Sequence, residues 1–237
     1  MTSLILCMIN HGKSQQFTAG LMTGIGKYSM EDLKNINSEV GYNHHFDTRL
    51  VSNFPVYIYF QPVLMMQIER TNIGVIYSFH STGSRISAKD YSGEYRFDMI
   101  VNSNNPGIYL DYQLDSTSKI DFKLYGIGGI SLSKLKMNEY LVVQDKVLAN
   151  DDQSFISTNY DIQAGLNFNY KILEYLSVGI YCGYLVQVSR KGFYVSGNKD
   201  AQLAIRPKWN GFRTGFKVSF MPHQFKKVQR ARENPGI

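Results

Sequence analysis

The chain has 237 residues, of which 43% are hydrophobic, 14% aromatic and only 19% charged, with a net charge of +6. No run approaches the ~20 consecutive apolar residues of a membrane-spanning helix. Part of the positive charge lies in the C-terminal tail, so nucleic-acid binding is not indicated either. The content of 17 Tyr, 14 Phe and 20 Gly is typical of a β-rich protein, because aromatic residues fit pleated sheets and glycine serves turns.

The N-terminal segment, residues 1–16, begins apolar and ends polar. It resembles the end of a secretory signal, and we interpret it as a signal-peptide remnant or an N-terminal extension. A first strand is expected over 17–28, where apolar residues alternate with other types. A long polar loop over 29–53 follows. Its His44-His45 pair predicts no metal site, because a lone pair of loop histidines is usually solvated.

The second strand is expected over 55–69. It contains Pro62, which cannot donate a ladder hydrogen bond, so we expect a bulge there. After a tight turn, the third strand covers 72–80, and a polar loop is expected over 81–93.

The fourth strand, 95–114, changes its parity. Apolar residues occupy odd positions up to Val101 and even positions from Ile108 onward. Since a slip of one residue exchanges the two faces of a strand, the pattern predicts a bulge or kink within 102–107. The fifth strand, 120–132, follows a short turn.

The clearest alternation lies in the sixth and seventh strands, 159–172 and 176–188. Apolar residues occupy the even positions of both strands, and Leu185 is the one exception on the odd positions of the seventh. A strict period of two predicts strands with one apolar and one polar face. The length of these strands suits tilted strands that cross a bilayer.

Long and short connections alternate along the eight expected strands. The remaining long loops cover 137–154 and 196–207, and the last strand covers 209–221. Short turns therefore lie at one end and long loops at the other, as in up-and-down transmembrane barrels. The sequence predicts an all-β fold, an eight-stranded antiparallel up-and-down transmembrane β-barrel over 17–221, without a helix.

A soluble, lipocalin-like ligand-binding barrel would show the same alternation. However, the polar face is rich in Gly, Ser, Asn, Gln and Tyr, whereas a water-exposed face would carry more Lys and Glu. Aromatic residues also gather at both strand ends, as in interfacial girdles. The expected girdles are Phe17, Tyr112, Tyr170 and Phe220 at the short-turn end, and Tyr28, Phe79, Tyr95, Phe193 and Trp209 at the other.

The last strand resembles the β-signal read by the barrel assembly machinery, which has a polar residue, a glycine, an apolar residue and an aromatic residue at fixed spacing. The matching residues are Arg213, Gly215, Val218 and Phe220. Many barrels end at this signal, whereas this chain continues into a basic tail, 222–237, which we expect in the periplasm.

From residue 17 to 220 the chain resembles the small outer-membrane β-barrel proteins of Bacteroidetes-type bacteria, which are OmpA/OmpX-like in architecture. The segments 106–112 and 123–129, PGIYLDY and KLYGIGG, look like the fourth and fifth strands of that family. The resemblance implies a fold and a location in the outer membrane of a Gram-negative bacterium. It does not imply an activity.

Eight strands enclose an interior just wide enough to be filled by side chains. The charged residues expected on the inner face are nearly balanced in sign, and buried ions must be paired. We therefore predict a salt-bridge network that fills the lumen, with a narrow channel as the alternative. The predicted network consists of Glu69, Arg96, Asp98, Asp111, Asp121, Lys123, Asp161, Lys171, Arg213 and Lys217.

No catalytic, metal or cofactor motif is apparent. The adjacent pair His80-Ser81, with Glu94 as a spatial partner, is a candidate for a lipid-modifying enzyme at the membrane rim. We instead expect a non-enzymatic protein without a cofactor, whose loops recognise another molecule. The expected partners are outer-membrane lipid, the barrel assembly machinery and a surface or secretion-machine protein, and no nucleic acid.

Overall fold

A computed structural model describes residues 16–43, 48–91, 93–117, 119–144, 146–189, 191–195 and 198–222. The elements are β1 (Gln16–Tyr28), α2 (Glu31–Asn43), β2 (Arg49–Asn53), β3 (Tyr57–Ile68), β4 (Thr71–Lys89), β5 (Gly93–Ser116), β6 (Ile120–Val143), β7 (Lys146–Leu173), β8 (Leu176–Gln187), β9 (Tyr194–Val195), β10 (Asn198–Gln202) and β11 (Gly211–Phe220). Residues 1–15, His44-His45 and the tail from residue 223 lie outside the described residues, so the predictions made for them stay predictions.

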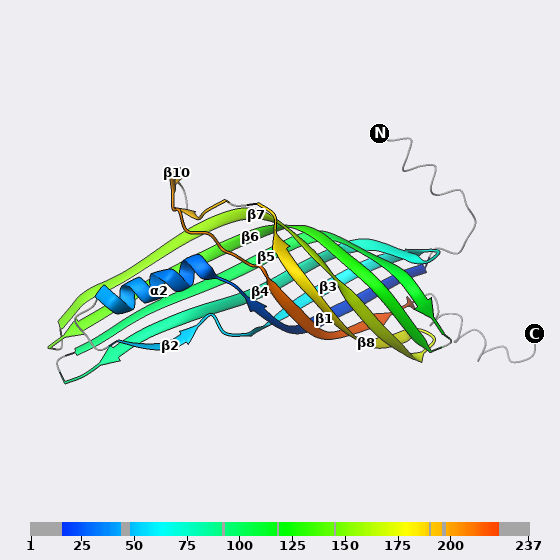
Figure 1. Cartoon of the computed structure of the whole chain (residues 1–237), viewed down its shortest axis with the longest axis horizontal. Coiled ribbons are helices and arrows are strands. Elements are labelled where there is room, and N and C mark those ends of the chain that lie inside the picture. Colours follow the sequence, from blue (N-terminus) through cyan, green and yellow to red (C-terminus); the bar gives the residue numbers. More distant parts are fainter. Residues whose placement is uncertain are drawn as a thin grey trace, which may run out of the picture.

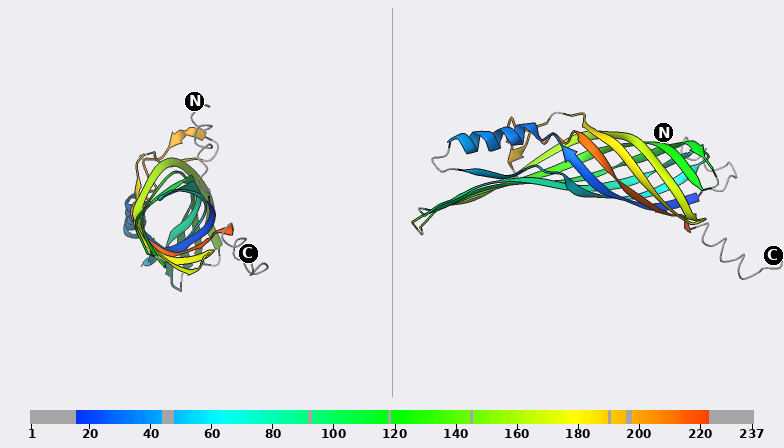
Figure 2. Two further views of the ribbon diagram at one scale, coloured as in Figure 1. Left: turned by 90° about the vertical axis from the view of Figure 1, so that its right-hand side faces the viewer. Right: turned by 60° about the horizontal axis from the view of Figure 1, so that its bottom comes forward.

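Eight strands close into a ring. Each pairs with its neighbours in the order β1, β3, β4, β5, β6, β7, β8 and β11, and β11 pairs with β1 again, always antiparallel. The ring is visible when the molecule is seen from its short-turn end (Figure 2). The prediction of an eight-stranded antiparallel up-and-down barrel is confirmed. No helix in the described residues is long and apolar enough to span a membrane.

The outer surface of the ring is apolar. In β7, the side chains of Tyr160, Ile162, Leu166, Phe168 and Tyr170 point outward and are 41–56% exposed. The eleven residues from the first to the last of these span about 34 Å along the strand, or about 26 Å at a tilt of 35–45°, which matches the apolar band of a transmembrane barrel. A soluble ligand-binding barrel would have its apolar face inside, so that alternative is wrong.

The aromatic girdle at the short-turn end lies as expected. Phe17, Tyr112, Tyr170 and Phe220 are all exposed on the outer surface. At the other end the prediction is wrong for four of the five residues, since only Phe79 is exposed. The other four are buried: Tyr28, Tyr95, Phe193 and Trp209. These four residues belong to an apolar core that lies beyond the membrane-facing apolar band of the barrel. We call this apolar band the belt.

The register shows why the parity change in the fourth strand was misread. The β4–β5 register runs without a shift from Thr71↔Tyr112 to Lys89↔Glu94, so the bulge predicted within 102–107 is absent. Odd residues of β5 face inward throughout, from Tyr95 to Asp111. The inward side chains of β5 are mostly polar within the belt and apolar beyond it, and this difference produces the change of parity in the sequence. The register at Pro62 is also unshifted, so no bulge forms there.

Two loops predicted from polar composition are strands instead. β4 and β5 continue through most of 81–93, and β6 and β7 continue through most of 137–154 (Figure 1). In residues 81–89 the burial alternates because one face packs on a core and the other meets water, whereas no residue described within 137–154 is buried. The loop predicted over 196–207 contains the short strand β10.

The loop predicted over 29–53 contains the helix α2 and the strand β2, so the expectation of a chain without a helix is wrong. Leu33, Ile36 and Val40 recur at helical spacing and pack against buried residues of the extended strands. Glu31 and Asp32 occupy the first turn of α2, where acidic side chains are favourable. We call α2, β2, residues 82–98 and 134–156 of the extended strands, and residues 191–209 the lobe. Its core includes Tyr95, Phe97, Leu135, Phe155, Phe193 and Trp209.

Candidate functional site

A buried carboxylate organises the half of the lumen near the short turns. Asp111 accepts hydrogen bonds from Asn72 Nδ2 at 2.6 Å and from the Tyr109 hydroxyl at 3.0 Å. The ammonium groups of Lys217 and Lys123 lie 3.7 and 3.8 Å from its two oxygens. Lys217 also donates to the Tyr109 hydroxyl at 2.9 Å. The carboxylate therefore has partners on both oxygens, as a buried ion requires.

A buried guanidinium organises the other half. Arg213 donates to Gln163 Oε1 at 3.0 Å and to the Tyr28 hydroxyl at 3.2 Å, and its Nη2 lies 3.2 Å from a ring nitrogen of His80. It also lies over the Tyr59 ring, 4.9 Å from the centroid. Asp161, another predicted residue, accepts a hydrogen bond from Asn105 in the same half.

A layer of four tyrosines separates the two halves. Tyr109 stacks on Tyr125 with centroids 6.0 Å apart, and Tyr181 meets both Tyr125 and Tyr59 edge-on. A cavity beside Arg213 and Asp161 has a volume of only about 10 Å³. This is too small for a continuous water path, so the lumen is filled by side chains and a narrow channel is not supported.

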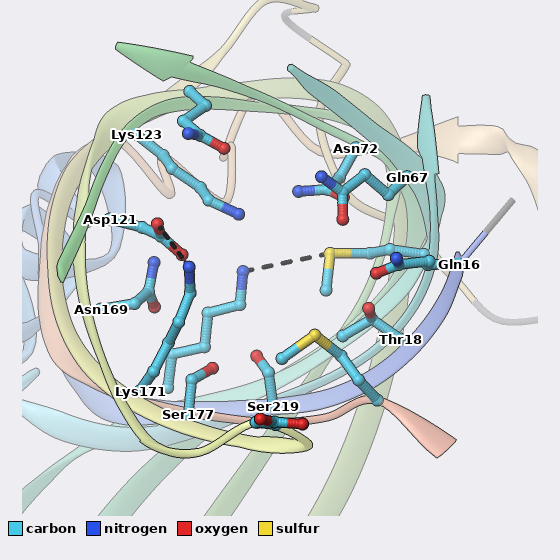
Figure 3. A pocket seen from close by; sticks show the side chains of 15 residues that line it. Gln16, Thr18, Gln67, Asn72, Asp121, Lys123, Asn169, Lys171, Ser177 and Ser219 are labelled. Carbon is cyan, nitrogen blue, oxygen red and sulfur yellow. Dashed lines mark hydrogen bonds and ion pairs between the residues drawn. The ribbon is translucent and has the colours of Figure 1, made fainter. Parts of the chain in front are cut away.

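The lumen opens into a vestibule at the short-turn end. Its volume is about 480 Å³, and Lys123, Lys171 and Lys217 line it together with amide and hydroxyl side chains. Figure 3 shows Lys123 and Lys171 pointing into it. Lys171 is paired with Asp121 at 3.2 Å. Lys217, which lines the vestibule, donates to Tyr109 of the tyrosine layer, so this layer lies next to the vestibule.

The structure brings seven of the ten predicted network residues into the lumen, in two clusters and one peripheral ion pair. The prediction is wrong for Arg96 and Asp98, which lie on the outer face of the lobe beside Arg85. Both were misplaced because the parity change was read as a bulge. Glu69 lies in the β3–β4 turn with a positive φ of 56° and is exposed, so it is not a lumen residue either.

His80 and Ser81 do not form a nucleophile–base pair. His80 is fully buried in the lumen, where its ring packs against Trp209 with centroids 4.3 Å apart. Ser81 is the next residue of the same strand and points to the opposite face. Glu94 lies far along the sheet, opposite Lys89. The rim-enzyme alternative therefore loses its candidate residues.

Charged and polar contacts of α2 hold the lobe together. The Lys208 ammonium lies 2.6 Å from Glu31 and 3.0 Å from Asp32, and the backbone N–H of Arg206 donates to Asp32 at 3.1 Å. Asn37 on α2 donates to Asn53 of β2 at 3.0 Å and accepts from Ser84 of β4 at 3.2 Å. The segment before β11, the helix and the extended strands thus form one packed unit.

Lys208 forms ion pairs with Glu31 and Asp32 of α2, which we call the clamp. These ion pairs depend on the positive charge of Lys208. Hydrogen bonds to Glu31, and then to Asp32, raise the pKa of Lys208 above its ordinary value of 10.5. A raised pKa means that the stabilisation is fully present below pH 10.5 and is lost as the pH rises through the higher, folded-state pKa.

We expect the fluorescence of Trp209, the single tryptophan of the chain, to report this loss in an alkaline titration. In the Lys208→Met variant, the fluorescence change caused by loss of the clamp should be missing. The quenching caused by tyrosine ionisation should remain. Superimposable titrations of the two proteins would contradict the prediction.

Sequence reasoning missed the tyrosine layer and the core of the lobe. The four tyrosines occupy positions of the polar face, where a large side chain in a narrow barrel has to point into the lumen. The tyrosine layer could therefore have been predicted from the positions of these residues on the polar face. The lobe core could have been predicted, with less support, from the helical spacing of apolar residues in α2.

Comparisons with known proteins give structural neighbours only. No family model matches the chain, and no curated protein matches it. Neisserial surface protein A, NspA, is 11% identical, with a TM-score of 0.40 over 88% of this chain and 99% of the other. Ail, the attachment invasion locus protein of Yersinia pestis, solved with the heparin analogue sucrose octasulfate, is 10% identical, with a TM-score of 0.38 over 87% and 96%. The translocator domain of the autotransporter NalP from Neisseria meningitidis is 10% identical, with a TM-score of 0.24 over 92% of both chains.

Proposed function

We propose that this protein is a non-enzymatic barrel of a Gram-negative outer membrane whose lobe binds a partner at the cell surface. The partner is a surface protein or a component of an envelope machine such as a secretion apparatus. Insertion depends on the barrel assembly machinery, which reads Arg213, Gly215, Val218 and Phe220 in β11. The orientation follows from the connections, since short turns of such barrels face the periplasm and longer connections face outward.

One observation carries the proposal: an apolar belt of membrane height encloses a lumen filled by side chains, and a packed lobe continues beyond it. A lumen filled by side chains does not favour transport through the barrel. The lobe has its own apolar core and a charged outer face, so it presents a defined surface outside the membrane. Binding residues concentrate on such segments when a rigid scaffold positions them.

The location is tested first by heat modifiability of the full chain, extracted from membranes in a mild detergent. A folded barrel resists the detergent of the gel and migrates faster before boiling than after it. We expect this shift, and we expect the protein in the membrane fraction. A soluble protein without a shift would overturn the proposal.

The orientation is tested by cysteine labelling of intact cells with a membrane-impermeant maleimide. Arg49→Cys places a thiol on β2 in the lobe, and Asp115→Cys places one at the end of β5, beside the short turn. We expect the first to react in intact cells and the second only after lysis. The unsubstituted chain, which contains Cys7 and Cys182, is the control for background labelling. The reverse pattern would place the lobe in the periplasm.

A further inference from the structure

Two lysines lie on the outer face of β6, directly beyond the apolar belt. Lys134 and Lys136 are both exposed, and the last large apolar residue before them on this face is Leu132, which is 44% exposed. Outward residues of a strand follow one another every second position. The two ammonium groups therefore continue the row that forms the belt.

No carboxylate lies directly opposite these lysines in the two neighbouring strands. In the register, Lys134 lies between Asn102 of β5 and Ile156 of β7, and Lys136 lies between Ile100 and Ser154. Neither lysine forms an ion pair within the described part of the chain. Two like charges on one face of one strand repel each other, so this arrangement favours an external anion.

The lysines lie at the depth of the lipid headgroups. They follow Leu132 by two and four residues, about 7 and 14 Å along the strand. The barrel tilt reduces these distances to about 5 and 10 Å above the hydrocarbon. The headgroup layer is about 5–8 Å thick on each side of the membrane, and the long lysine side chain can reach down to its polar groups.

The charge continues above this level on the same face. Asp98 is paired with Arg85 at 2.6 Å and lies 3.5 Å from Arg96. Together with Lys134 and Lys136, these residues form a patch of four cations and one carboxylate. The exposed Asp152 of β7 borders it and accepts a hydrogen bond from Asn138 at 2.6 Å. We call the four cations and Asp98 the basic patch.

We propose that the basic patch binds the phosphate groups of lipids in the surrounding membrane leaflet. The inference rests on the proposed membrane location. The phosphates supply the counter-charge that the sequence around Lys134 and Lys136 lacks, and the exposed Ile100 between the cations stays in contact with the lipid. A soluble polyanion would also be attracted by the positive charge, but it would make no contact with the apolar belt next to the lysines, whereas a lipid contacts both.

The test measures lipid binding by the full chain in neutral mixed micelles. The probes are lipid A with both phosphates and the same lipid after dephosphorylation, and inorganic phosphate is the soluble competitor. The Lys134→Gln/Lys136→Gln variant is compared with Lys34→Gln/Lys146→Gln, which removes two positive charges from the lobe, one on α2 and one at the far tip of the β6–β7 pair. Lys134→Arg/Lys136→Arg keeps the charge.

We expect the Lys134→Gln/Lys136→Gln variant to bind the phosphorylated lipid roughly 10- to 30-fold more weakly, because each basic residue near an anionic surface contributes about 1 kcal/mol. The control pair and the arginine variant should bind as the natural chain does. Three results would overturn the inference. These are equal binding of the dephosphorylated lipid, an equal loss of binding in the control pair, and complete competition by millimolar phosphate. Heat modifiability of each variant separates this outcome from failure of the membrane proposal, since a folded barrel with unchanged lipid binding overturns the patch alone.

Discussion

Replacement of Trp209 by alanine is expected to destabilise the lobe by about 3–5 kcal/mol, the usual cost of removing a buried tryptophan side chain. Trp209 is fully buried at the junction of lobe and barrel. Its ring meets Tyr28 and His80 edge-on, and its Nε1 donates to Ser133 Oγ at 2.8 Å. The substitution would leave a cavity where the lobe meets the lumen and would remove one of the hydrogen bonds of the Ser133 hydroxyl, which keeps its contacts with Ser103 and Ser131.

The effect should be local, and hydrogen exchange can detect that. We expect amides of α2 and of residues 203–209 to lose protection in Trp209→Ala, while amides of β7 and β8 inside the belt keep theirs. Trp209→Phe is the matched control, because it retains most of the ring and should lose much less. Unchanged exchange in α2 would show that the lobe does not depend on this contact.

A second large effect is expected in the lumen. Asp111→Leu removes the carboxylate that lies between Lys217 and Lys123. The side chain of Lys217 is only 2% exposed, so its charge would be left buried without a counter-ion. Breaking a buried ion pair in this way costs about 3–5 kcal/mol. The measurement is the urea midpoint of unfolding in detergent.

The double variant Asp111→Leu/Lys217→Met decides whether charge is the cause. Removal of both partners leaves no buried ion at this point, and well-packed apolar replacements of buried pairs are often neutral. We therefore expect the double variant to be more stable than Asp111→Leu alone. If the two losses simply add, the destabilisation comes from packing and the ion pair has no special role.

The barrel itself was predictable because its signal is local and repeated. In β7 and β8 every second residue is apolar, and a period of two residues is enough to assign faces without any knowledge of the tertiary structure. The girdle at the short-turn end was predictable for the same reason, since Phe17, Tyr112, Tyr170 and Phe220 all continue the apolar row of their strands.

The lobe was not predictable from the same rule, because the rule assumes one environment for the whole strand. In β5 the inward positions change from Asp111 and Asn105 inside the belt to Phe97 and Tyr95 beyond it. The sequence records this as a change of parity, which a bulge would also produce. Only the position of α2 over the extended strands distinguishes the two cases, and that is a long-range contact.

The lumen contacts were likewise beyond the sequence. Parity places Arg213, Gln163 and His80 on the inner face, but it does not say which of them meet. Their contacts depend on the stagger between strands that are not adjacent in the ring. Asp161 and Lys171 were expected as members of one network, yet Lys171 pairs with Asp121 at the vestibule and Asp161 contacts Asn105.

The seam between β1 and β11 has a consequence for the order of folding. These strands come from opposite ends of the described chain, and they meet along a register from Ala19↔Phe220 to Tyr28↔Gly211. At its centre Gly24 faces Gly215, where an added Cβ would meet backbone oxygens at 2.0 and 2.1 Å. The hairpins β3–β4, β5–β6 and β7–β8 can form from short stretches of chain, whereas the seam requires almost all of it. We therefore expect the ring to close last, with β11 available for contact with another protein until it meets β1.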